Sequence, residues 1–196
     1  MSRRKIAVDL DDVLAAHVEA FVEFSNSRYA TNITPEEYND HWTNIWGDMS
    51  HDEIVARAAE FHTHESVVQY DVKPGAQDAI AELARENDLY IVTARPKQIV
   101  DASLEWIDMH FPGVFQDVRF VPIWDPANTK TKADICKEIG ATYLIDDIPR
   151  HCDIAAAAGI TALIFGDYSW NRSHDLTPGV IRCHTWADVI AAIENE

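Results

Sequence analysis

Two pairs of carboxylates, far apart in the sequence, are suited to phosphoryl or metal chemistry. Asp9 and Asp11 follow the apolar run 6–8, and Asp146 and Asp147 follow a second such run. Carboxylates packed together repel unless a hard cation lies between them, and an all-oxygen ligand set favours Mg²⁺. A carboxylate can also attack phosphorus, and one placed two residues on can protonate the leaving oxygen and later activate water.

A hydroxyl and basic side chains occur in comparable positions. Thr93 and Arg95 follow the apolar run 89–92, and Lys130 and Lys132 lie beyond a third run. A hydroxyl and an ammonium group suit the oxygens of a phosphoryl group, whose charge must be held in place. Lys132, which opens a predicted helix, is the preferred phosphate ligand; Lys130 is the alternative, or else a solvated loop charge.

The elements that must position these residues alternate between short apolar runs and helical patterns. This alternation predicts an α/β fold with a doubly wound, mostly parallel sheet covered by helices on both faces. Ligands bind such sheets beyond the carboxyl ends of the strands, so the candidate residues are expected to converge at one edge. The predicted strands are 6–8, 89–92, 118–121, 143–145 and 162–165, and the predicted helices are 76–85, 96–112, 133–139, 152–158 and 186–193.

Residues 15–72 interrupt the alternation, because their pattern is helical or irregular throughout. Residues 34–37 predict a helix start, and residues 50–53 form a predicted capping box. We therefore expect a small helical cap, residues 16–72, inserted after the first strand of a core made of residues 1–15 and 73–196.

The cap is rich in aromatic residues and histidine. His17, Trp42 and Trp46 are candidates for substrate contact. The alternative is that such a stripe of rings in a helical insertion forms the interior of the cap.

The composition restricts the partners and the compartment. With 16 basic against 33 acidic residues the net charge of the 196-residue chain is −17, which disfavours binding to duplex nucleic acid or to anionic membranes. Three cysteines without metal-type spacing fit a reducing compartment, and neither a signal peptide nor a membrane span is evident. We expect a cytoplasmic protein, monomeric or homodimeric, that acts on a small molecule.

The sequence resembles the phosphatases of the haloacid dehalogenase (HAD) superfamily. Residues 9–14, Asp-Leu-Asp-Asp-Val-Leu, match their Asp-x-Asp-x-(Thr/Val)-aliphatic motif, and the resemblance covers roughly residues 4–14 and 74–170. The remaining motifs match at Thr93, at Lys132 or Lys130, and at Asp146-Asp147. Within the superfamily the chain is most similar to the 5′(3′)-deoxyribonucleotidases and their bacterial relatives.

This resemblance implies a HAD-like, Rossmann-like core and a set of roles. Asp9 would be the nucleophile and Asp11 the acid and base, with Thr93 and the lysine binding phosphate. Mg²⁺ would be held by Asp9, the backbone carbonyl of Asp11 and Asp146, with Asp147 either as a further ligand or as a support for the other ligands. Two positions depart from the pattern: Asp12 stands where many relatives have glycine, and Arg95 is not shared by the whole superfamily and is expected to touch substrate.

The function expected from this resemblance is Mg²⁺-dependent hydrolysis of a phosphomonoester through an aspartyl phosphate, with a nucleoside 5′- or 3′-monophosphate as the leading substrate. One alternative is a phosphatase for another small metabolite, such as a sugar phosphate or phosphoglycolate. The other is a phosphate-binding protein without turnover, although a pure binder has no need of an acid and base such as Asp11.

Overall fold

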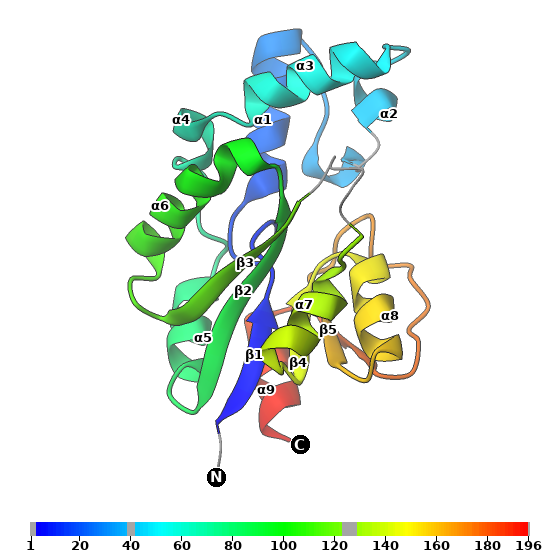
Figure 1. The fold of residues 1–196 in the computed structure, drawn as a ribbon. Coiled ribbons are helices and arrows are strands. Elements are labelled where there is room, and N and C mark those ends of the chain that lie inside the picture. Colours follow the sequence, from blue (N-terminus) through cyan, green and yellow to red (C-terminus); the bar gives the residue numbers. More distant parts are fainter. Residues whose placement is uncertain (1–2, 39–41, 123–128, 196) are drawn as a thin grey trace.

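The computed structural model describes residues 3–38, 42–122 and 129–195. Its centre is a six-stranded sheet in the order β3-β2-β1-β4-β5-β6, in which every pair of neighbouring strands is parallel (Figure 1). The predicted α/β class is therefore confirmed. The strands are β1 (Arg4–Val8), β2 (Asn87–Arg95), β3 (Phe115–Pro122), β4 (Tyr143–Asp146), β5 (Thr161–Phe165) and β6 (Val180–Cys183).

Helices cover both faces of the sheet, and the strands alternate between them. Ile6 and Val8 belong to an apolar cluster with residues of the helices 76–83, 100–110 and 186–194, which are α5, α6 and α9. Ala7 belongs to a second cluster, with residues of the helices 132–139 and 149–157, which are α7 and α8. This alternation is the period of two that a strand imposes on its side chains. The helices are α5 (Ala76–Leu83), α6 (Val100–His110), preceded by the 3₁₀ turn Lys97–Ile99, α7 (Lys132–Ile139), α8 (Pro149–Ala157) and α9 (Trp186–Glu194).

Local sequence sets most of these boundaries. At the start of α7 the Thr131 hydroxyl accepts from the Asp134 N–H while the Asp134 carboxylate accepts from the Thr131 N–H, and Gly140 ends the helix in the left-handed region. The prediction did not include β6, a strand of four residues. In the described ranges, no helix is both long and apolar enough to cross a membrane.

The segment between β1 and α5 is helical, as its pattern predicted. Its elements are α1 (His17–Tyr29), a 3₁₀ turn (Pro35–Glu37), α2 (Trp42–Trp46), α3 (His51–Phe61) and α4 (His64–Val67). We call residues 16–72 the cap. Figure 1 shows its helices above the edge at which the strands β1 and β2 end.

The chain enters and leaves the cap at adjacent points. Ala15 and Val72 form an antiparallel bridge. The Ala16 N–H donates to the Asp71 carbonyl, and the Lys73 N–H donates to the Leu14 carbonyl, both at 2.8 Å. The cap is therefore tied to the core by two short paired linkers.

Aromatic rings fill the interior of the cap. Phe61 is fully buried and lies against Phe21, Phe24 and Tyr70, with ring centroids 5.3 to 5.9 Å apart. These rings belong to the same apolar cluster as β1 and β2. The cap and the core therefore share one apolar interior.

We expect Phe61→Ala to lower the free energy of unfolding by about 3–5 kcal/mol, because it leaves a cavity among these rings. Val55→Ala, on the exposed side of the same helix, should change it by about 0.5 kcal/mol or less. Urea unfolding measures both, and equal effects of the two substitutions would contradict this account of the cap interior.

Candidate active site

Asp9 is the first residue beyond β1 and is almost completely buried. Its N–H donates to the Ile145 carbonyl at 2.9 Å, and its Oδ1 accepts from the Leu10 N–H at 2.7 Å. Burial raises the pKa of Asp9 to about 6, and the charges of Asp146 and Asp11 act in the same direction against the opposing ammonium of Lys132. The backbone thus fixes a carboxylate whose charge is only partly compensated.

Lys132 supplies that ammonium group. It is the first residue of α7, its side chain is 2% exposed, and its Nζ lies 2.7 Å from both Asp9 Oδ2 and Asp146 Oδ2. Although burial opposes it, the two carboxylates raise the pKa of Lys132 above its ordinary value. Lys130 is 58% exposed and pairs with Glu138 at 2.6 Å, so the structure brings Lys132, the preferred candidate, to the aspartates.

Asp146 is the last residue of β4, and Asp147 comes directly after it. The Asp146 Oδ1 accepts from the Ile148 N–H at 2.9 Å and lies 3.2 Å from His151 Nδ1. Although burial opposes ionisation, Lys132 and His151 lower the pKa of Asp146. Burial raises the pKa of Asp147 well above its ordinary value, and the neighbouring charge of Asp146 adds to the effect.

Three of these carboxylates are placed to share a cation. Oxygen atoms of Asp9, Asp146 and Asp147 all lie within 4.8 Å of one another, and all three residues are buried. An all-oxygen donor set of this kind, with one lysine against three carboxylates, fits a hard divalent cation such as Mg²⁺. The Asp11 side chain lies outside this group.

Asp11 instead forms an ion pair with Arg95, the last residue of β2. The Arg95 Nη2 donates to Oδ1 at 2.5 Å and its Nε donates to Oδ2 at 3.0 Å, while Nη1 donates to Ser103 Oγ at 2.7 Å. Although burial opposes ionisation, the guanidinium lowers the pKa of Asp11 far below its ordinary value. Arg95 is itself 2% exposed and its guanidinium binds Asp11; the expected contact of Arg95 with substrate stays a prediction.

Thr93 also lies in β2 and is completely buried. Within the part of the chain that the structure describes, its Oγ1 has no hydrogen-bond partner. An unpaired buried hydroxyl costs stability. Thr93 does not itself line the pocket, whereas its neighbour Ala94 does.

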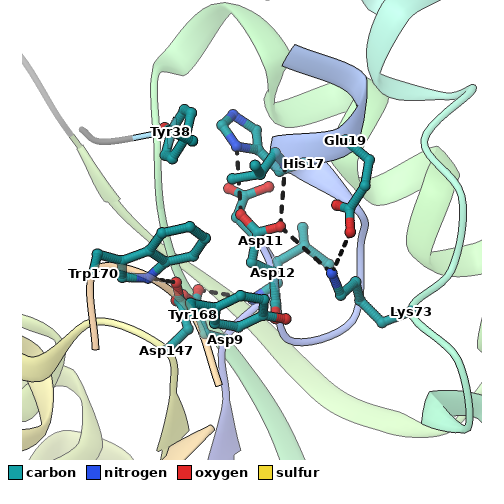
Figure 2. Close-up of polar contacts among 12 residues, drawn as sticks. Asp9, Asp11, Asp12, His17, Glu19, Tyr38, Lys73, Asp147, Tyr168 and Trp170 are labelled. Atoms are coloured by element: carbon teal, nitrogen blue, oxygen red, sulfur yellow. Dashed lines mark hydrogen bonds and ion pairs between the residues drawn. The ribbon is translucent and has the colours of Figure 1, made fainter. Parts of the chain in front are cut away.

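A pocket of about 610 Å³ opens over the carboxylates, and side chains from both the cap and the core line it. The cap contributes His17 and Tyr38, and the core contributes Trp170 (Figure 2). His17 Nδ1 lies 3.7 Å from Asp12 Oδ2. Although burial opposes it, the charges of Asp11 and Asp12 raise the pKa of His17, so His17 joins Lys132 and Arg95 as a basic group beside the aspartates of residues 9–12.

The other two cap candidates occupy different places. Trp46 is buried and its Nε1 donates to Ser25 Oγ at 2.8 Å. Trp42 stacks on Phe21 with ring centroids 4.8 Å apart, and its Nε1 donates to the Tyr38 hydroxyl. Neither lines the pocket, and both pack into the ring-filled interior of the cap, which is the alternative given above; the substrate contacts expected of Trp42 and Trp46 stay predictions.

The sequence analysis missed Tyr38 and Trp170. Trp170 Nε1 donates to Asp147 Oδ2 at 2.8 Å, which places an indole directly beside the carboxylate cluster. A signal was available, because Trp170 follows the carboxyl end of β5 and so falls under the same rule that located Asp9 and Asp146. Tyr38 carried no comparable signal.

Comparison with known proteins gives consistent matches. The family model described as 5′ nucleotidase, deoxy (pyrimidine), cytosolic type C protein matches residues 3–195. A protein of Staphylococcus epidermidis, described as a candidate 5′(3′)-deoxyribonucleotidase, is 31% identical over 161 residues, covering 79% of this chain and 79% of that protein.

Solved structures show the same fold. A haloacid dehalogenase-like hydrolase from Streptococcus pneumoniae matches with a TM-score of 0.66 at 16% identity, covering 97% of this chain and 98% of that one. A candidate HAD hydrolase from Bacillus subtilis, described as bound to magnesium and as revealing interdomain movement, matches with a TM-score of 0.65 at 15% identity, covering 98% and 99%.

We expect Lys132→Met to lower the free energy of unfolding by about 3–5 kcal/mol at pH 8 without added metal, because it leaves buried carboxylates without their cation. Lys130→Met removes an exposed ion pair and should cost about 0–1 kcal/mol. Urea unfolding of the two variants measures the difference. Similar values would show that the lysine between Asp9 and Asp146 does not compensate their charge.

Proposed function

The chain belongs to the family of 5′ nucleotidase, deoxy (pyrimidine), cytosolic type C proteins, within the HAD superfamily, and we propose that it hydrolyses nucleoside monophosphates with Mg²⁺ through a phosphorylated Asp9. The observation that carries this proposal is the buried group of Asp9, Lys132, Asp146 and Asp147, of which Asp9, Lys132 and Asp147 line the pocket. Such a group suits a phosphomonoester because it combines a fixed nucleophile with positive charge for the phosphoryl oxygens.

The chain's own residues would hold the phosphoryl group in place. Lys132 Nζ, already beside Asp9, would donate to one phosphoryl oxygen, and the unpartnered hydroxyl of Thr93 to another. Asp9, Asp146, Asp147 and, as the resemblance implies, the Asp11 carbonyl would hold Mg²⁺, whose positive charge would offset the repulsion between substrate and carboxylates.

In the first step an oxygen of the Asp9 carboxylate attacks phosphorus while the bond from phosphorus to the leaving oxygen breaks. The leaving oxygen takes a proton, which we assign to Asp11. Because Arg95 favours the ionised carboxylate, Asp11 can donate this proton only after the contact with Arg95 loosens.

In the second step water attacks the phosphorus of the phosphorylated Asp9. Asp11 accepts the proton of that water, the bond between phosphorus and the Asp9 oxygen breaks, and phosphate leaves. The ionised form of Asp11 that Arg95 stabilises is the form required here. The two steps therefore place opposite demands on the same carboxylate.

We also propose that the protein works in the cytosol. The described cysteines, Cys136, Cys152 and Cys183, are all buried free thiols. Free thiols of this kind fit a reducing compartment.

We expect phosphate release from nucleoside monophosphates to require Mg²⁺, and Asp9→Asn to reduce it by about a thousandfold or more, as for other essential nucleophiles. The control is Asp167→Asn, which alters an exposed carboxylate and should leave turnover unchanged. The measurement is phosphate release from a panel of nucleotides and sugar phosphates, with Mg²⁺ or with EDTA.

Release that survives both EDTA and Asp9→Asn would contradict the mechanism. Turnover of sugar phosphates without turnover of nucleotides would contradict the substrate class. If folded protein released phosphate from no compound, the phosphate-binding alternative would replace the proposal.

A further inference from the structure

One wall of the pocket is a flat aromatic surface on the core. Trp170 lines the pocket, whereas Tyr168, which stacks on it, does not. Their ring centroids are 4.5 Å apart and their planes differ by 5°. Tyr168 covers one face of the indole, so the pocket meets Trp170 on the part of its surface that Tyr168 leaves open, next to Tyr38.

The loop between β5 and β6, which carries Trp170, holds the indole in a fixed position. Trp170 Nε1 donates to Asp147 Oδ2, and the Asn171 side chain donates to the carbonyls of Asp147 and Phe165 at 3.0 and 2.8 Å. Glycine at position 166 makes this packing possible, since a Cβ there would overlap the Tyr168 ring. A ring fixed before a ligand arrives costs little ordering entropy on binding.

Tyr38 reaches the same wall from the cap. The Tyr38 and Trp170 rings are T-shaped, with centroids 5.5 Å apart and planes at 71°, and Figure 2 shows Tyr38 above Trp170, with Asp9, Asp11 and Asp12 beside them. Ser169 Oγ donates to the Tyr38 carbonyl at 3.4 Å. The two aromatic residues therefore meet where the cap touches the core.

The aromatic wall lies next to the reactive group. The carboxylate that holds the indole, Asp147, has an oxygen within 4.8 Å of oxygens of Asp9 and Asp146. A substrate whose phosphoryl group is at Asp9 must extend its remaining atoms along the pocket. A planar ring attached a few bonds from the phosphate is the shape that this wall accommodates, because bases stack on aromatic side chains.

We propose that Trp170 determines substrate specificity by stacking on the nucleobase, with Tyr38 bounding the same site from the cap. This inference rests on the proposed function and adds to it the residue that distinguishes a nucleotide from a base-free phosphate. Trp170 also holds Asp147 through Nε1, so a test must separate the ring from the hydrogen bond.

Two substitutions make that separation. Trp170→Phe keeps an aromatic face and loses the N–H donor, whereas Trp170→Leu loses both and remains apolar. The substrates are a matched pair: a deoxynucleoside 5′-monophosphate and deoxyribose 5-phosphate, which lacks the base. Loss of the hydrogen bond to Asp147 affects both substrates alike, because both place a phosphoryl group at Asp9.

We expect Trp170→Leu to reduce the ratio of kcat/KM for the nucleotide to kcat/KM for deoxyribose 5-phosphate by about 10- to 100-fold, mainly through KM, the range of base stacking on aromatic side chains. Trp170→Phe should keep the ratio close to that of the unsubstituted protein. Tyr38→Phe retains the ring and should likewise keep it.

An unchanged ratio in Trp170→Leu would overturn the inference and leave Trp170 as a support for Asp147. A protein that does not prefer the nucleotide over deoxyribose 5-phosphate would overturn it as well. The proposed phosphatase mechanism is judged separately, by whether release from either substrate requires Mg²⁺ and Asp9.

Discussion

The concentration of buried negative charge at one edge of the sheet is the constraint on which the rest of the site depends. Asp9, Asp146 and Asp147 are each at most 4% exposed, and burying several carboxylates is unfavourable unless they are paired. Lys132 pairs with two of them, while burial, with the neighbouring carboxylates, raises the pKa of Asp9 and of Asp147. A cation bound among these carboxylates would offset part of their mutual repulsion.

The parallel sheet makes this concentration possible. Its strands all end at the same edge, so the loops after β1 and β4 bring their aspartates together although more than a hundred residues separate them in sequence. The N–H of Asp9 donates to the carbonyl of Ile145, which fixes one loop against the other. The geometry of the carboxylates is therefore a property of the sheet's register.

The loop after β5 extends this arrangement to the cap. Asn171 and Trp170 hold Asp147, and Arg172 Nη2 donates to Glu36 of the cap at 3.0 Å. On the other side of the site Lys73 lies 2.8 Å from Glu19 of the cap and 3.9 Å from Asp12 of the core. Polar contacts of this kind between cap and core are individually weak, so the apolar cluster that the cap shares with β1 and β2 supplies most of the contact between them.

The sequence by itself determined the α/β class, the helical segment between β1 and α5, and the positions of Asp9, Asp11, Thr93 and Asp146 at strand ends, because periodicity and spacing are local properties. Only the tertiary structure showed which lysine reaches the aspartates. Lys132, the first residue of α7, lies against Asp9, whereas Lys130 is exposed and pairs with Glu138. The tertiary structure also decided that Arg95 binds Asp11 and that Trp170, rather than Trp42 or Trp46, lines the pocket. Those outcomes depend on which side chains meet across elements distant in sequence, and a one-dimensional pattern does not contain that information.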